Sequence, residues 1–236
     1  MAEPLVLLPG MMCDARLFGP QIAELSAEMA VMVAPVTQGE RVEEIASGLL
    51  DLMPKRFALA GQGMGGIVAM ELLRRAPDRI SRICLIGTNP LAETPAVAAN
   101  REPQIVKVRS GRLLEVMRDE IPPATLAPGL QRAEVQDLVM DMAEALGAEV
   151  YIRQSRALQR RRDQQAVLRK CKVPALVMCG QYDELSPVKR HSFMAELIPY
   201  AKLVVMENAG HLPTLEQPAE TTAALREWMR QPLVLQ

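Results

Sequence analysis

The chain has 236 residues and a mass of 26.0 kDa, with 49% hydrophobic residues, 23% charged residues and a formal net charge of −1. This composition excludes a disordered chain and a coiled coil, and the sequence has no apolar run long enough for a membrane span. The near-neutral charge gives no reason to expect nucleic acid or a membrane surface as a partner. We therefore predict a compact domain, with room for an inserted cap.

The first ten residues, MAEPLVLLPG, have no basic segment before the apolar run, so we interpret them as a strand rather than a signal peptide. Two histidines, His191 and His211, show no ligand spacing, and neither a metal site nor another cofactor is predicted. The cysteines have no CxxC spacing and are predicted to be buried, reduced thiols of a cytoplasmic protein: Cys13, Cys84, Cys171 and Cys179.

Short apolar segments alternate with helical patterns along the chain. Several of the segments are apolar at every position, which is typical of parallel strands buried on both faces. The predicted strands are Leu5–Leu8, Val31–Ala34, Phe57–Ala60, Ile83–Ile86, Ala175–Cys179 and Leu203–Met206. The predicted helices cover about 42–53, 65–75, 186–197 and 218–229, with Ser186 as the N-cap of the third and Pro187 as its first residue. This rhythm predicts an α/β fold, with a mostly parallel sheet of about six strands and helices on both faces.

Residues 91–172 interrupt the rhythm, because they show helical patterns and no clear strand. We predict a helical cap here, over the carboxyl edge of a core formed by residues 1–90 and 173–236. Acidic residues gather between 134 and 149, and basic residues between 151 and 172. Two interpretations stay open: neighbouring cap helices with complementary faces, or a pocket for an anionic substrate lined by Arg153, Arg156 and Arg160.

A glycine-rich turn, Gly61-Gln62-Gly63-Met64-Gly65-Gly66, follows the third predicted strand and opens a helix. It is not a phosphate-binding GxxxxGK[ST] loop, and GxGxxG fails because no glycine follows at the required position. Strand, tight turn and helix form the context of a nucleophile elbow. The turn resembles the G-x-S-x-G elbow of the α/β-hydrolase family, with Gly63 where that family has serine.

Two further loops carry the same resemblance, which extends from Leu5 to Trp228. Asp183, in GQYDELSP after the fifth strand, matches the family's triad acid, and His211, in NAGHLP after the sixth, matches its base. The backbone amides of Met11 and Met64 match the oxyanion hole. Pro9 stands where the family often has histidine, which leaves the number of amide donors unchanged.

Each of these residues has a less specific alternative. Glu184 could replace Asp183 as the acid, and His191 is predicted to be structural because it lies mid-helix. Cys13 lies at the wrong place in the chain to be a thiol nucleophile. Met12, together with the methionines at 11 and 64, suggests an apolar acyl pocket.

The resemblance implies hydrolysis of a small carboxylic ester, lactone, thioester or amide through a Ser-His-Asp triad and an acyl-enzyme. The basic cap segment adds that the substrate could carry a carboxylate; the oligomeric state is not readable. Because Gly63 has no hydroxyl, we expect this chain to be nearly inert by that route. Three interpretations remain: an inactive enzyme in which Gly63 is an engineered replacement of the nucleophilic serine, a ligand-binding pseudoenzyme, or a His211–Asp183 enzyme that works without serine, as a lyase or a cofactor-free oxygenase does.

Overall fold

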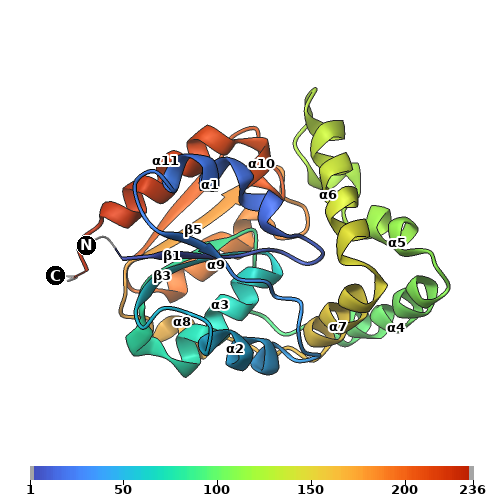
Figure 1. The fold of residues 1–236 in the computed structure, drawn as a ribbon, viewed down its shortest axis with the longest axis horizontal. Helices are drawn as coiled ribbons and strands as arrows, with labels where there is room; N and C mark the ends of the chain where they lie inside the picture. Colours follow the sequence, from blue (N-terminus) through green and yellow to red (C-terminus); the bar gives the residue numbers. More distant parts are fainter. Residues whose placement is uncertain (1–2, 234–236) are drawn as a thin grey trace.

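The computed structural model describes residues 3–233, which contain a six-stranded parallel sheet with helices on both faces (Figure 1). The strand order is β2-β1-β3-β4-β5-β6. The strands are β1 (Leu5–Leu8), β2 (Val31–Val33), β3 (Phe57–Gln62), β4 (Ile80–Ile86), β5 (Ala175–Gly180) and β6 (Ala201–Met206). The predicted fold class and all six predicted strands are confirmed.

Strand β4 begins earlier than the apolar pattern predicts. Its first residues include Ser81 and Arg82, and these polar side chains hid the start of the strand. Arg82 is nevertheless buried, because its guanidinium pairs with Glu3 and donates to the carbonyl of Trp228, with an Nη1–O distance of 2.6 Å. A charged side chain can lie in a buried strand when it is paired in this way.

Alternate residues of each strand enter different halves of the core. Leu5 and Leu7 of β1 pack in the layer that includes α1 (Gly19–Leu25) and α11 (Pro218–Arg230). Val6 and Leu8 pack in the opposite layer, whose helices are α2 (Val42–Leu50), α3 (Met64–Arg75), α8 (Gln165–Arg169) and α9 (Val188–Leu197). Burial of each such side chain stabilises the fold by about 1.5–3 kcal/mol. The two-sided burial explains why β1 is apolar at every position.

The start of α9 differs from the prediction. Pro187, with φ −58° and ψ 156°, is the N-cap, and no side chain caps the helix. The backbone N–H of Ser186 instead donates to Asp183 Oδ1 at 2.8 Å. The prediction of Ser186 as N-cap is therefore wrong, because this segment turns around the Asp183 carboxylate before the helix begins.

Four helices between β4 and β5 lie beyond one end of the sheet, on the right of Figure 1. They are α4 (Pro95–Arg109), α5 (Leu113–Glu120), α6 (Arg132–Leu146) and α7 (Ala148–Gln159). Helix α8 follows them but packs against α3 and α9 beside the sheet. We use "cap" below for residues 91–162; the division of the chain into core and cap stays a prediction.

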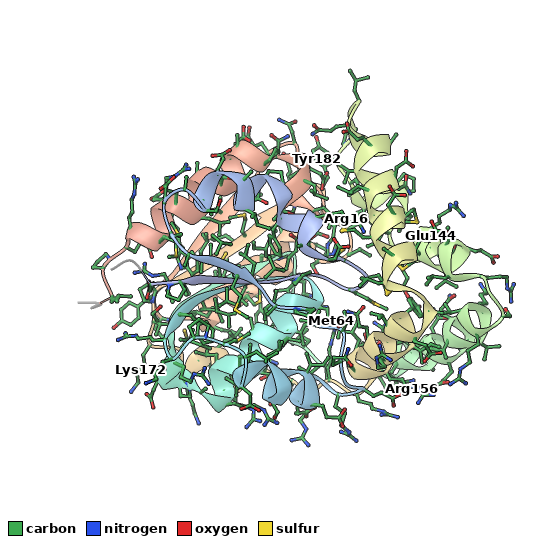
Figure 2. The ribbon with its side chains drawn as sticks, in the orientation of Figure 1. Arg16, Met64, Glu144, Arg156, Lys172 and Tyr182 are labelled. Carbon is green, nitrogen blue, oxygen red and sulfur yellow. The ribbon has the colours of Figure 1, made fainter. Side chains whose placement is uncertain are left out.

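Three basic residues at and just after the end of α7 pair with acidic side chains of the core. Arg156, labelled in Figure 2, lies on α7 and is 3.1 Å from Glu40. Arg160 lies 3.6 Å from the same carboxylate, and Arg162 lies 3.1 Å from Glu43 in α2. Among residues 3–233, no ion pair joins α6 to α7. The expected complementary faces of two cap helices are therefore wrong, because acidic side chains of the core are within closer reach of α7.

Candidate active site

Gly63 forms a sharp turn between β3 and α3. Its φ of 55° and ψ of −118° are unfavourable for a residue with a side chain, by about 1–3 kcal/mol, and glycine relieves that strain. Gly65 lets α3 approach β1, since a Cβ there would lie 2.0 Å from the Leu8 carbonyl oxygen. The end of β4 and the loop after it hold the turn. The Gly63 N–H donates to Ile86 O at 2.9 Å, and Thr88 Oγ1 donates to Gly63 O at 2.7 Å.

The structure brings His211 and Asp183 together beside this turn. His211 Nδ1–H donates to the Asp183 carboxylate, with distances of 3.1 Å to Oδ1 and 3.0 Å to Oδ2. A Cβ built on Gly63 would lie 3.8 Å from His211 Nε2. The Nε2 atom has no hydrogen-bond partner in the described part of the chain. The imidazole therefore faces the position where a nucleophile would stand, and its other nitrogen is oriented by a carboxylate.

Burial and charge act in opposite directions on His211. Burial disfavours the imidazolium, but the charge and hydrogen bond of Asp183, with a smaller contribution from Glu216, raise the pKa of His211 above its usual value. Asp183 itself is buried, and its Oδ1 also accepts from Ser186 N–H. The pair thus forms a stronger base than a free histidine, which suits proton removal from a neighbouring group.

The predicted oxyanion amides flank Gly63. Met64 is the first residue of α3, so its N–H has no carbonyl to bond within the helix. Met11 follows Gly10, whose Cα would lie 3.7 Å from a Cβ at position 63. Among residues 3–233, neither amide donates a hydrogen bond. Two free donors beside one carbonyl position are what a developing oxyanion requires.

Glu216 holds the histidine loop and was not singled out from the sequence. Its buried carboxylate accepts three backbone N–H groups: those of Gly210 (2.9 Å), Leu212 (2.8 Å) and Ala127 (2.7 Å). The motif H-L-P-T-L-E contains this glutamate, but its partners could not be read from the sequence. Charge-assisted bonds of this kind are about twice as strong as neutral ones.

Two more contacts fix the loop from outside. Gln62, the residue before Gly63, donates from Nε2 to the His211 carbonyl oxygen at 3.1 Å. The His211 N–H donates to Thr125 O of the cap at 2.8 Å. A side chain at Gly210 would collide with this segment, since its Cβ would lie 2.2 Å from Thr125 O. The cap and the sheet edge therefore position His211 together.

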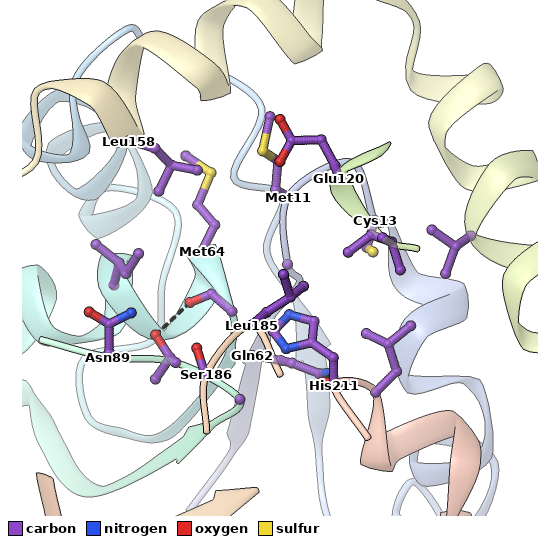
Figure 3. A pocket seen from close by; sticks show the side chains of 18 of the residues that line it. Met11, Cys13, Gln62, Met64, Asn89, Glu120, Leu158, Leu185, Ser186 and His211 are labelled. Atoms are coloured by element: carbon purple, nitrogen blue, oxygen red, sulfur yellow. Dashed lines mark hydrogen bonds between the residues drawn. The ribbon is translucent and has the colours of Figure 1, made fainter. Parts of the chain in front are cut away.

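A pocket of about 410 Å³ opens above Gly63, between the sheet edge and the cap (Figure 3). The imidazole of His211 points into it, below Met11 and Met64. The apolar side chains that the cap adds to its lining are Val97, Met117, Ile121, Val139 and Leu158. An apolar pocket with a few polar groups is typical of a site for a small molecule.

The four predicted substrate-binding side chains lie outside this pocket. Met12 is fully buried below it, and its N–H donates to Gln154 Oε1. Arg153 donates from Nε to Thr37 O, while Arg156 and Arg160 face Glu40. The structure thus contradicts the expectation that these arginines face the substrate, because α7 turns them toward the core. The arginines that line the pocket are Arg101 and Arg161.

The alternative residues occupy other places. Glu184 lines the pocket but is exposed, and it is Asp183 that contacts His211. Burial, with a contribution from Asp14, raises the pKa of Cys13 to about 12, so its thiol stays protonated. His191 is buried and accepts the N–H of Thr88 at Nε2, which gives it a structural contact behind Gly63.

Two features are missing from residues 3–233. No group of three or more His, Cys, Asp or Glu side chains in that range could hold a metal ion. No helix in the same range is long and apolar enough to cross a membrane.

Comparison with known proteins places this arrangement in a family. The sequence pattern described as "Alpha/beta hydrolase family" matches residues 5–225. The chain belongs to the alpha/beta hydrolase family. Among curated alpha/beta hydrolases, a pimeloyl-[acyl-carrier protein] methyl ester esterase of Aromatoleum aromaticum is 28% identical over 212 residues, which span 82% of each protein.

Solved structures of alpha/beta hydrolases agree. A thermophilic esterase from Thermogutta terrifontis, with malate bound, has a TM-score of 0.88 and 27% identity, and the match covers 97% of this chain and 89% of that one. The enol-lactonase of Burkholderia xenovorans LB400 has a TM-score of 0.86 at 24% identity, over 98% of this chain and 92% of that one. At 24% identity the similarity to the enol-lactonase shows the fold alone. The Thermogutta terrifontis and Aromatoleum aromaticum esterases are somewhat more similar in sequence, at 27% and 28% identity.

Proposed function

We propose that this alpha/beta hydrolase takes a small carboxylic ester, lactone, thioester or amide into the pocket beside His211. The observation that carries the proposal is the distance of 3.8 Å between His211 Nε2 and a Cβ built on Gly63. A serine hydroxyl lies one bond beyond its Cβ and would come within hydrogen-bond range of the imidazole. His211 and Asp183 then act as base and orienting acid.

In a form with serine at position 63, His211 Nε2 removes the hydroxyl proton while the oxygen attacks the substrate carbonyl carbon. The leaving group departs with that proton, and water then hydrolyses the acyl-serine by the same steps. The Met11 and Met64 amides donate to the oxyanion, each contributing about 3 kcal/mol to transition-state stability. Asp183 keeps the Nδ1 proton in place throughout.

Gly63 removes only the nucleophile from this set. Loss of a triad serine lowers turnover by about 10⁶-fold, so the chain binds its substrate without appreciable covalent turnover. We propose that one Ser→Gly change separates it from an active esterase. The retained His211–Asp183 pair and the free amides support this, because a serine at position 63 would complete the set of groups that ester hydrolysis requires.

The relatives support an ester as the substrate class. The Aromatoleum aromaticum relative is a methyl ester esterase, and the Thermogutta terrifontis esterase is described with malate, a small dicarboxylic acid. A pocket of about 410 Å³ falls within the range of volumes that small-molecule sites have. We also propose a cytoplasmic setting, because Cys13, Cys84, Cys171 and Cys179 are all free thiols.

A second candidate is catalysis without serine. Nε2 of His211 is unpaired among the described residues and opens onto the pocket, and the pKa of this histidine is raised. Such a base could activate water in the space beside Gly63 or abstract a substrate proton, as lyases and cofactor-free oxygenases do. A protein that only binds a ligand would need the pocket and neither of these features.

The test compares Gly63, Gly63→Ser and Gly63→Ala proteins on p-nitrophenyl esters. The alanine variant adds the same backbone strain without a hydroxyl. Hydrolysis by the serine variant alone, with a burst of nitrophenolate, supports the triad. Turnover by all three that His211→Ala abolishes supports the serine-independent route, and ligand binding without turnover by any of them supports a binding protein.

A further inference from the structure

Four charged side chains line the pocket on its cap side. Glu93 precedes α4, Arg101 lies on α4, Glu120 ends α5 and Arg161 follows α7. The family resemblance assigned no role to any of them. Three of them form hydrogen bonds with other side chains, whereas Arg161 donates only to a backbone carbonyl.

Glu93 is already saturated by Arg101. Arg101 Nε donates to Glu93 Oε1 at 3.0 Å and Oε2 at 2.8 Å, and its Nη2 pairs with the same carboxylate. Arg101 Nη1 donates to Ser155 Oγ at 3.4 Å. Glu120 has its own partner, since Oε1 accepts from the Tyr151 hydroxyl at 2.9 Å. Glu93 and Arg101 therefore offer little unused bonding capacity, and Glu120, as an acceptor, cannot bind an anion.

Arg161 differs from Arg101. Its Nε donates to Leu91 O at 3.0 Å, but Nη1 stays 3.8 Å from Glu93 Oε1, beyond hydrogen-bond distance. Neither terminal nitrogen of Arg161 has an acceptor among residues 3–233, although the side chain is only 12% exposed. Burial lowers its pKa, which Glu93 opposes and the charge of Arg101 reinforces. The side chain lines the pocket, so its terminal N–H groups are open to an acceptor there, and a hydrogen bond to a charged acceptor in a largely buried place is a strong one.

We propose that Arg161 binds a free carboxylate of the substrate, so that the pocket takes an ester, lactone or amide that also carries a carboxylate. A planar carboxylate can accept from both terminal nitrogens of one guanidinium. The two nearby acids, Glu93 and Glu120, repel two negative charges on one group more than the single charge of a carboxylate group, which favours carboxylate over phosphate at Arg161. That the substrate is an ester, lactone or amide rests on the proposed function, whereas the contact between Arg161 and a carboxylate can be tested independently of it.

Binding to the protein as it stands tests the anion contact directly. The probes for isothermal titration calorimetry are succinate, glutarate, adipate and their uncharged dimethyl esters, with inorganic phosphate as the competing anion. We expect at least one dicarboxylate to bind better than its dimethyl ester. Arg161→Gln weakens this binding by about ten- to hundredfold, the range expected for bonds to a charged group. The matched control is Arg162→Gln, which removes the same charge from a side chain that is 76% exposed and pairs with Glu43.

Kinetics in the Gly63→Ser background supply a second readout. We expect monomethyl esters of dicarboxylic acids to be preferred over dimethyl esters, and Arg161→Gln to lower kcat/KM for the monomethyl esters more than for the dimethyl esters, so that the preference is lost. The matched Arg162→Gln variant should keep the preference. Arg161→Lys keeps the positive charge but loses the two parallel N–H donors of the guanidinium, so this variant should retain part of the preference for monomethyl esters. It also serves if Arg161→Gln fails to fold, which thermal melting followed by circular dichroism reports.

The two proposals fail in different ways. If dicarboxylates bind through Arg161 but Gly63→Ser hydrolyses no ester, the anion contact stands and the hydrolase proposal falls. If esters are hydrolysed without a preference for charge, the anion contact falls and the hydrolase proposal stands. Equal binding by Arg161→Gln and Arg162→Gln, no dicarboxylate binding at all, or tighter binding of phosphate than of every dicarboxylate would each overturn the assignment to a carboxylate.

Discussion

The sheet edge and the cap position their side chains by different means. At the edge, Gly63, Asp183 and His211 each follow a strand of the parallel sheet within a few residues, so the sheet geometry determines where they meet. In the cap, Arg156 is placed by Glu40, which is distant in sequence and belongs to the core. Local motifs are therefore a sound guide to the edge and a poor guide to the cap.

The two regions meet at the histidine loop. Glu216 accepts N–H groups from both the loop and the cap segment, and Thr125 of the cap accepts the His211 N–H. The variants below alter, in turn, the side chains at the sheet edge, the contacts at the histidine loop, and the ion pairs between cap and core. Their expected effects decrease in that order.

The largest effect is expected at the edge. Asp183→Asn in the Gly63→Ser background lowers kcat by about 10⁴-fold, because the amide no longer holds the Nδ1–H tautomer of His211. Steady-state hydrolysis of a p-nitrophenyl ester measures it. Glu184→Gln alters the neighbouring acid and should cause a much smaller change; the reverse order would assign the acid to Glu184.

The same pair predicts a pH dependence. The base acts only when neutral, and Asp183 raises the pKa of His211, so the acid limb of kcat/KM lies above the usual value of about 6.5. In Asp183→Asn the residual activity should therefore extend to lower pH. If the acid limb of the kcat/KM profile moved to higher pH in Asp183→Asn, the result would contradict the role of the Asp183 carboxylate.

An intermediate effect is expected at the junction. Glu216→Gln replaces an acceptor oxygen with an NH₂ group that faces backbone donors, and we expect the free energy of unfolding to fall by about 2–4 kcal/mol. Urea denaturation measures this loss. A purely structural role would leave the acid limb of the serine variant unchanged, whereas loss of the Glu216 charge should move it to lower pH.

The control for this junction is Glu220→Gln. Glu220 is exposed in the first turn of α11 and should change neither the unfolding free energy nor the pH limb appreciably. Equal effects of the two substitutions would remove Glu216 from the set of residues that position His211.

The smallest effect is expected where the cap pairs with the core. Glu40→Gln breaks partly exposed contacts with Arg156 and Arg160, which stabilise the fold by about 1 kcal/mol or less. Urea denaturation at low and high salt detects it, since salt screens such pairs. A loss much larger than this, compared with exposed Glu207→Gln, would show that the cap depends on its ion pairs.

These regions also mark what sequence reasoning can reach. Strands β1, β3, β4 and β5 were largely predictable because both of their faces are buried. The paired Arg82 hid the start of β4, and the exposed Lys202 hid the start of β6. Gly63, Asp183 and His211 were found because their motifs are short and continuous. Glu216 and Gln62 were missed as supports, since their partners are backbone groups of other loops. The direction of the cap arginines depends on helix packing, which no local pattern records.

The most direct test of the central claim is covalent labelling at position 63. Diisopropyl fluorophosphate reacts with a serine hydroxyl only when a neighbouring base removes its proton, and fluoride leaves. Intact-protein mass spectrometry of Gly63→Ser should show one adduct per chain, on the introduced serine, and none for the Gly63 or Gly63→Ala proteins. The adduct should also be lost in the double variant with His211→Ala. An unlabelled Gly63→Ser protein, or labelling that survives without His211, would contradict the account.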